Sequence, residues 1–202
     1  FIDRNSTAGL YFYLRGESQL AAHRIDAAED DFRAALLRKY ESPALKNQLA
    51  WLLITEGELN RPRIEEAVKL AREAVRAERN GAFLNTLGWA LYLRGDTVAA
   101  ITQLQAAQRA HSSSDPTRIL DLHMLAMAHF KKGDRERARQ LYDEALELER
   151  SLANPSLADR VSRGLLGVVR TEPALRDVAE DIEEFRLQTE VVLGLKPLES
   201  EF

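Results

Sequence analysis

The chain has 202 residues, of which 45% are hydrophobic and 30% charged, and its formal net charge is -4 at pH 7. This length allows a substantial buried core, and the acidic balance argues against a general nucleic-acid-binding protein, which would carry a basic excess. The absence of cysteine excludes disulfides, thiolate metal sites and cysteine nucleophiles, and no apolar run approaches the roughly 18 residues of a membrane span.

Leu, Ala, Arg and Glu dominate the composition, which favours helix throughout. In chain order, the apolar spacing predicts helices over residues 6–22, 25–40, 43–57, 63–79, 81–94, 97–111, 116–132 and 135–151. Gly95 and Gly133 are expected to end helices in the left-handed conformation, and the Asp that follows each glycine is expected to cap the next helix. After Asn154-Pro155 the sequence predicts a helix as far as Arg170 and a final one beginning near Thr171-Glu172-Pro173.

A short alanine pattern recurs four times along these helices. Each copy has the form Ala-x3-large-x2-Ala, with Ala in the large position of the second copy, and the copies begin at Ala28, Ala67, Ala100 and Ala138. The spacing of 33 to 39 residues is close to a period of about 34 that is typical of paired-helix repeats. The extra residues are expected in two loops, Gly57–Pro62 and Ser112–Asp115, where insertion costs little.

The segments Leu87–Asp96 and Leu125–Asp134 resemble the first half of a tetratricopeptide repeat, in the style of repeats found in bacterial multidomain proteins. The resemblance implies an all-α fold, a right-handed α-solenoid of about four helical hairpins followed by C-terminal capping helices. The expected organisation is a repeat array over 1–154, with units at about 8–41, 42–79, 80–115 and 116–151, and capping helices and a tail over 155–202. Because the chain begins with Phe1 and not Met, it is expected to be part of a longer protein. A cytoplasmic location is the expectation.

No residue pattern predicts an enzyme, a cofactor or a metal site. The four histidines are scattered, and His123 and His129 lie six residues apart on one predicted helix, so they cannot chelate one ion. The adjacent carboxylates Asp30-Asp31, Glu65-Glu66 and Glu183-Glu184 are expected to face solvent. No nucleophile elbow or glycine-rich phosphate loop is present. The sequence therefore predicts a non-catalytic protein.

In the tetratricopeptide family, the first helix of each repeat lines a concave groove that holds a peptide or a partner helix. Alignment of the four units on their small residues gives the inward positions of these helices. The expected partner-binding residues are Tyr13, Asn47, Trp51, Asn85, Trp89, Tyr92, His123, Met127 and Phe130. Aromatic side chains are enriched among interface hot spots, and two asparagine amides could bind a peptide backbone.

Chaperone-binding members of the family grip a terminal carboxylate with Lys, Asn and Arg. The matching positions here include Tyr13, Glu17 and Gln48, so no cationic clamp is expected and Glu17 would repel a carboxylate. The predicted function is a protein-interaction scaffold for an apolar or aromatic partner segment, without nucleic-acid or membrane binding. Two alternatives stay open. The repeats could serve as a spacer or self-association module, with a homodimer through the C-terminal helices, or the 193–198 tail could occupy the groove.

Overall fold

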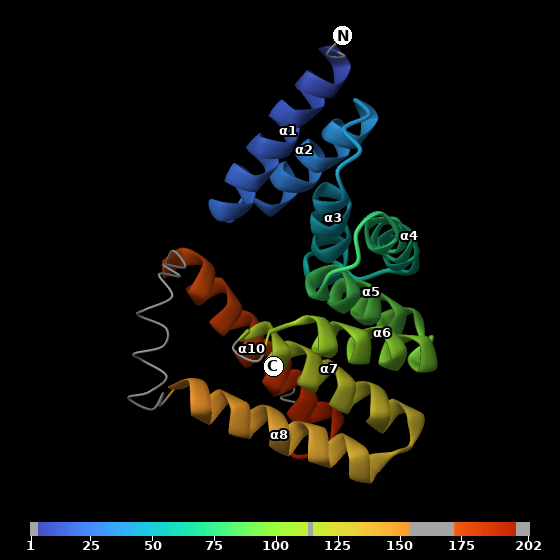
Figure 1. Ribbon diagram of the computed structural model, residues 1–202, viewed down its shortest axis with the longest axis vertical. Coiled ribbons are helices and arrows are strands. Elements are labelled where there is room, and N and C mark those ends of the chain that lie inside the picture. The colour runs from blue at the N-terminus through green and yellow to red at the C-terminus, as the bar shows by residue number, and fades with distance from the viewer. Residues whose placement is uncertain (1–3, 113–114, 154–171, 197–202) are drawn as a thin grey trace. The chain divides into compact units, whose positions relative to one another are not determined.

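A computed structural model of the chain describes residues 4–112, 115–153 and 172–196. Within these ranges every regular element is an α-helix (Figure 1). The helices are α1 (Arg4–Ala21), α2 (Ile25–Leu37), α3 (Pro43–Thr55), α4 (Arg61–Ala77), α5 (Gly81–Arg94), α6 (Thr97–Ala110), α7 (Thr117–Lys132), α8 (Arg135–Ala153) and α10 (Glu172–Val192). The all-α prediction is confirmed. The helix expected to end near Arg170 lies outside the described residues.

The helices form two compact units, Phe1–Asp96 and Thr97–Phe202. In the first unit α1 packs against α2, α3 against α4, and α4 against α5. In the second unit α7 packs against α6, α8 and α10. The division between the units falls between the two helices of the expected third repeat, 80–115.

Local sequence signals set the helix ends as predicted. Gly95 and Gly133 have φ values of 101° and 94°, in the left-handed region that only glycine adopts without strain. The Asp134 carboxylate accepts a hydrogen bond from the Arg137 backbone N–H at 3.2 Å, as expected for a cap. Side chains of Ser42, Asn60 and Asn80 cap α3, α4 and α5 in the same way.

Small residues allow the paired helices to approach closely. The leading alanines Ala28, Ala67, Ala100 and Ala138 have no exposed surface, and neither have Phe32 or Leu104. A Cβ atom built on Gly16 of α1 would lie 2.6 Å from the Phe32 ring of α2, closer than any real contact. Glycine is therefore required at position 16 for Phe32 to fill the space between α1 and α2.

The expected insertion between the helices of the second repeat is a loop over residues 56–60. Arg63 of α4 fixes this loop, because its guanidinium donates hydrogen bonds to the Leu53 carbonyl at 3.3 Å and the Glu56 carbonyl at 3.1 Å. The same side chain forms an ion pair with Glu29 of α2 at 3.0 Å. The second expected loop includes Asp115, whose carboxylate accepts a hydrogen bond from the Thr117 backbone N–H at 3.0 Å.

One expectation about carboxylates is wrong. Asp31 does not face solvent, because it is only 4% exposed and its two oxygens accept hydrogen bonds from the Arg15 guanidinium of α1. Asp31 and Phe32 are neighbours on α2, and both side chains contact α1. Since Arg15 is 44% exposed at its side chain, the pair connects a buried acceptor to a partly solvated cation.

Helix α10 is attached to the second unit by apolar and polar contacts. Phe185 is 3% exposed. The Tyr142 hydroxyl of α8 donates a hydrogen bond to the Glu190 carboxylate of α10 at 2.7 Å, and Arg186 forms an ion pair with Glu149 of α8 at 3.5 Å. Helix α10 is therefore bonded to α8 at two points while it packs against α7.

The Tyr142 contact predicts a dependence of stability on alkaline pH. Burial, and then the hydrogen bond to Glu190, raise the pKa of Tyr142 to about 12, against about 10 for an unfolded chain. The folded state therefore holds this proton more tightly, and the resulting stability is complete below about pH 10 and lost as the pH rises toward 12. We expect the difference in free energy of unfolding between wild type and Tyr142→Phe, measured in urea, to shrink across this window. A difference that stays constant would contradict the assignment.

Candidate protein-binding surfaces

The first helices of the predicted repeats lie next to one another in the first unit. Helix α3 packs against α5, and Gln48 of α3 donates a hydrogen bond to the Glu17 carboxylate of α1 at 3.3 Å. Helix α3 therefore lies between α1 and α5. The α1–α3–α5 face consists of the predicted inward residues of these helices, Tyr13, Glu17, Asn47, Trp51, Asn85, Trp89 and Tyr92.

The α1 end of this face is polar and carries an acid. Burial raises the pKa of Glu17, and the hydrogen bond from Gln48 partly opposes this effect. Tyr13 stacks on Tyr40, with ring centroids 5.5 Å apart, and burial raises the pKa of its phenol as well. The group that faces Glu17 is the neutral Gln48 amide. Neither residue is a cation that could bind a terminal carboxylate at this end of the face.

Asn47 has an unsatisfied acceptor at the centre of the face. Its side chain is only 8% exposed, and its Oδ1 atom is buried without a hydrogen-bond partner. A buried polar atom left unpaired costs roughly 1–3 kcal/mol, and such atoms in native proteins call for an explanation. Because this oxygen is covered, it lowers stability and offers no accessible acceptor to a partner in this structure.

Aromatic rings cover the α5 end of the face. Trp89 and Tyr92 are stacked, with centroids 4.9 Å apart and an interplanar angle of 11°. Trp89 is only 5% exposed and Asn85 only 7%, whereas Tyr92 on α5 and Trp51 on α3 are partly exposed. Burial raises the pKa of the Tyr92 phenol. Trp89 therefore supports Tyr92 from behind, and the accessible aromatic surface belongs to Tyr92 and Trp51.

The three predicted site residues of the second unit are on α7. His123 and Met127 are 0% and 1% exposed, and the His123 Nε2 atom lies 3.0 Å from the Glu149 carboxylate of α8. Their side chains have no surface available to a partner in this structure. Phe130 is partly exposed and lies 5.6 Å beneath the Arg135 guanidinium, a cation–π distance.

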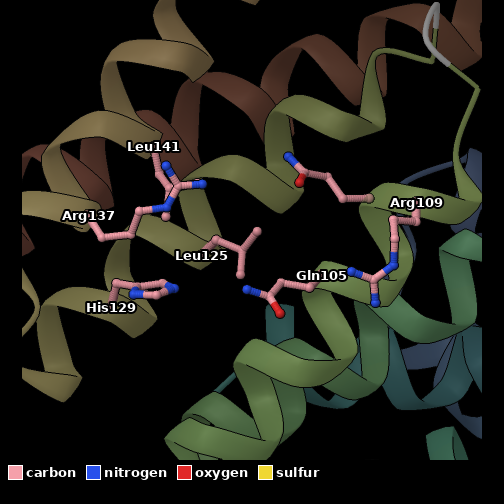
Figure 2. Close-up of a pocket in the computed structure, with 7 residues that line it drawn as sticks. Gln105, Arg109, Leu125, His129, Arg137 and Leu141 are labelled. Atoms are coloured by element: carbon pink, nitrogen blue, oxygen red, sulfur yellow. The ribbon is translucent and has the colours of Figure 1, made fainter.

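A cavity of about 240 Å³ lies among α6, α7 and α8 in the second unit (Figure 2). We call it the α6–α8 pocket, and it is lined by Gln105, Gln108, Arg109, Leu125, His129, Arg137 and Leu141. The sequence predictions do not include this pocket. The sequence signal that indicates it is the spacing of Gln105, Gln108 and Arg109, which places three polar side chains on one face of α6.

The described residues hold no group of three or more His, Cys, Asp or Glu side chains arranged to bind a metal ion. No described helix is long and apolar enough to cross a membrane.

Two sequence models of one family match the chain, both described as tetratricopeptide repeat. They match residues 58–115 and 120–152. These two segments are tetratricopeptide repeats. Tetratricopeptide repeats are scaffolds for protein–protein interaction, and the two matches support this general function for the chain. The α6–α8 pocket takes its residues from both matched segments.

The fold of the chain is similar to that of solved structures. One of them, described as the crystal structure of MamA protein, superposes with a TM-score of 0.58 at 16% sequence identity, and the match covers 100% of both chains. At this identity the likeness concerns the fold alone. A comparison with curated proteins gives no match.

Proposed function

We propose that the chain binds an extended segment or a helix of a partner protein on the α1–α3–α5 face. The observation that carries this proposal is the pair of partly exposed aromatic rings on this face, Trp51 on α3 and Tyr92 on α5. An apolar or aromatic residue of the partner would pack against these rings.

The charges on the face indicate which segments it favours. Glu17 and Gln48 occupy two of the positions with which a carboxylate-binding member of the family grips its ligand, and Glu17 repels an anion. The partner segment is therefore an internal stretch or a helix with an apolar or aromatic anchor, and its chain end does not need to enter the face.

A double substitution of the accessible aromatic residues tests the proposal. We expect Trp51→Ala with Tyr92→Ala to weaken binding of a peptide selected from a displayed library against the wild-type chain. The expected loss is at least tenfold in Kd, since hot-spot aromatic residues contribute about 2 kcal/mol or more each. Isothermal titration calorimetry measures the affinity, and circular dichroism checks that helicity is preserved. Trp89 is retained in this variant because it is buried.

Tyr11→Ala provides the matched control, since Tyr11 is an aromatic residue of α1 that is 58% exposed and lies outside the face. It should leave the affinity unchanged. Equal binding by the Trp51/Tyr92 variant and the wild type would rule the face out. Light scattering of the same samples addresses self-association, because a mass that rises with concentration would favour that alternative.

Asn47→Leu tests the cost of the buried oxygen on the same face. The substitution removes the unpaired oxygen at similar size, so we expect the melting temperature to rise while peptide affinity stays close to that of the wild type. A lower melting temperature would mean that the Asn47 amide is needed for packing.

A further inference from the structure

The α6–α8 pocket contains two arginines whose charge is not neutralised. Among the described residues, no carboxylate lies within ion-pair distance of Arg109 or Arg137. The Arg137 Nη1 atom donates a hydrogen bond to the neutral Gln140 amide at 3.2 Å, so its charge stays available. By contrast Arg139, also on α8, is paired with Asp143 at 3.2 Å. Most other arginines with partners in this fold bind carboxylates, as Arg15, Arg33 and Arg63 do.

Asp134 contacts two residues of the pocket but already has partners of its own. Asp134 accepts hydrogen bonds from the Arg137 backbone N–H at 3.2 Å and pairs with the His129 Nδ1 atom, also at 3.2 Å. These contacts, the backbone one first, lower the pKa of Asp134. Asp134 does not line the pocket. It therefore helps to hold the imidazole of His129 in its orientation.

The remaining polar groups of the pocket are mainly donors. The Nε2 atom of Gln108 is buried and has no hydrogen-bond partner. In Figure 2 the side chains of Gln105 and His129 point toward one another across the cavity, with Leu125 between them. Two guanidinium groups and an unpaired amide N–H around one cavity favour an acceptor that carries negative charge. The cavity volume equals that of about eight waters at roughly 30 Å³ each, enough for a tetrahedral oxyanion with part of its hydration.

We propose that the α6–α8 pocket binds the oxyanion group of an acidic or phosphorylated side chain in a partner protein. Arg109 and Arg137 neutralise the charge, and Gln108 donates the additional hydrogen bond. None of these residues belongs to the α1–α3–α5 face, so the pocket is a second contact point with its own chemistry. Specificity for charge comes from the pocket, whereas the α1–α3–α5 face selects apolar side chains.

The test begins with inorganic phosphate titrated into the ¹⁵N-labelled chain at constant ionic strength. We expect saturable shifts of backbone resonances in α6 and in the 129–137 region, with binding at least about tenfold weaker in the Arg109→Gln/Arg137→Gln variant. Arg139→Gln is the matched control, since Arg139 is also on α8 but outside the pocket, and it should bind phosphate as the wild type does. Because Arg109 and Arg137 are both exposed, the double variant should keep its fold, which circular dichroism checks.

Three short peptides that differ at one position, Ser, Glu or phosphoserine, then identify the source of the oxyanion. We expect the Ser peptide not to bind, and the Glu and phosphoserine peptides to bind in a way that depends on Arg109 and Arg137. Binding of inorganic phosphate without binding of either charged peptide would overturn the assignment to a protein side chain. Absence of saturable shifts in the wild type, or equal binding by the double variant, would overturn the site itself. The Trp51/Tyr92 variant should bind phosphate normally, so failure of this proposal is distinguishable from failure of the proposed function.

Discussion

Phe32→Ala is expected to lower the free energy of unfolding by about 3–5 kcal/mol, the usual cost of removing a buried aromatic ring. Phe32 has no exposed surface, and its ring lies directly against the backbone of Gly16. Glycine has no side chain that could move into the space left by the ring. The cavity between α1 and α2 would therefore collapse poorly, which places the effect toward the upper part of the range. Urea unfolding followed by circular dichroism measures it.

Leu37→Ala is the control on the same helix. Leu37 is 82% exposed, so its truncation should change the free energy of unfolding by no more than about 0.5 kcal/mol. If the two variants lose similar stability, α2 does not pack against α1 through Phe32 as the structure describes.

Phe185→Ala is expected to release α10 from the second unit. Phe185 is 3% exposed on a helix that packs against α7, and the loss of its ring should cost about 3–5 kcal/mol of local stability. The ion pair of Arg186 with Glu149 is partly exposed and contributes little by itself, so the Tyr142–Glu190 hydrogen bond is the main polar contact that remains. We expect amide hydrogen exchange in residues 182–192 to accelerate by at least a hundredfold, while exchange in the first unit stays unchanged.

Leu187→Ala serves as the reference for that experiment, since Leu187 is 42% exposed two positions along the same helix. It should leave the exchange rates of α10 close to those of the wild type. Equal acceleration in both variants would mean that the burial of Phe185 is not what holds α10 in the second unit.

The sequence predicted the helices well because the signals that end them are local. A left-handed glycine at 95 or 133 and a capping asparagine at 60 or 80 act within one turn of the helix they delimit. The close contact at Gly16 also depends on a single residue, since only a residue without a side chain allows a ring to reach the backbone.

Features that depend on pairs of distant side chains were not predictable in the same way. Asp31 looks like a solvated acid in sequence, and only the position of Arg15 on the preceding helix shows that it is buried and paired. The α6–α8 pocket is a similar case. In sequence, Arg109 and Arg137 resemble the many paired arginines of this chain, and only the structure shows that neither side chain forms an ion pair with a described carboxylate. The aromatic positions were predicted from the family pattern, but which of them is accessible depends on the stacking of Trp89 behind Tyr92.

Arg63 links the end of one helix to the position of the next. Helices α5 and α7 each carry their own stop signal in the glycine that follows them. The end of α3 has a local backbone bond from the Glu56 N–H to the Leu52 carbonyl, and in addition the Leu53 and Glu56 carbonyls accept hydrogen bonds from a guanidinium of α4. The last turn of α3 therefore depends in part on its partner in the hairpin, whereas the ends of α5 and α7 depend on the residue next to them.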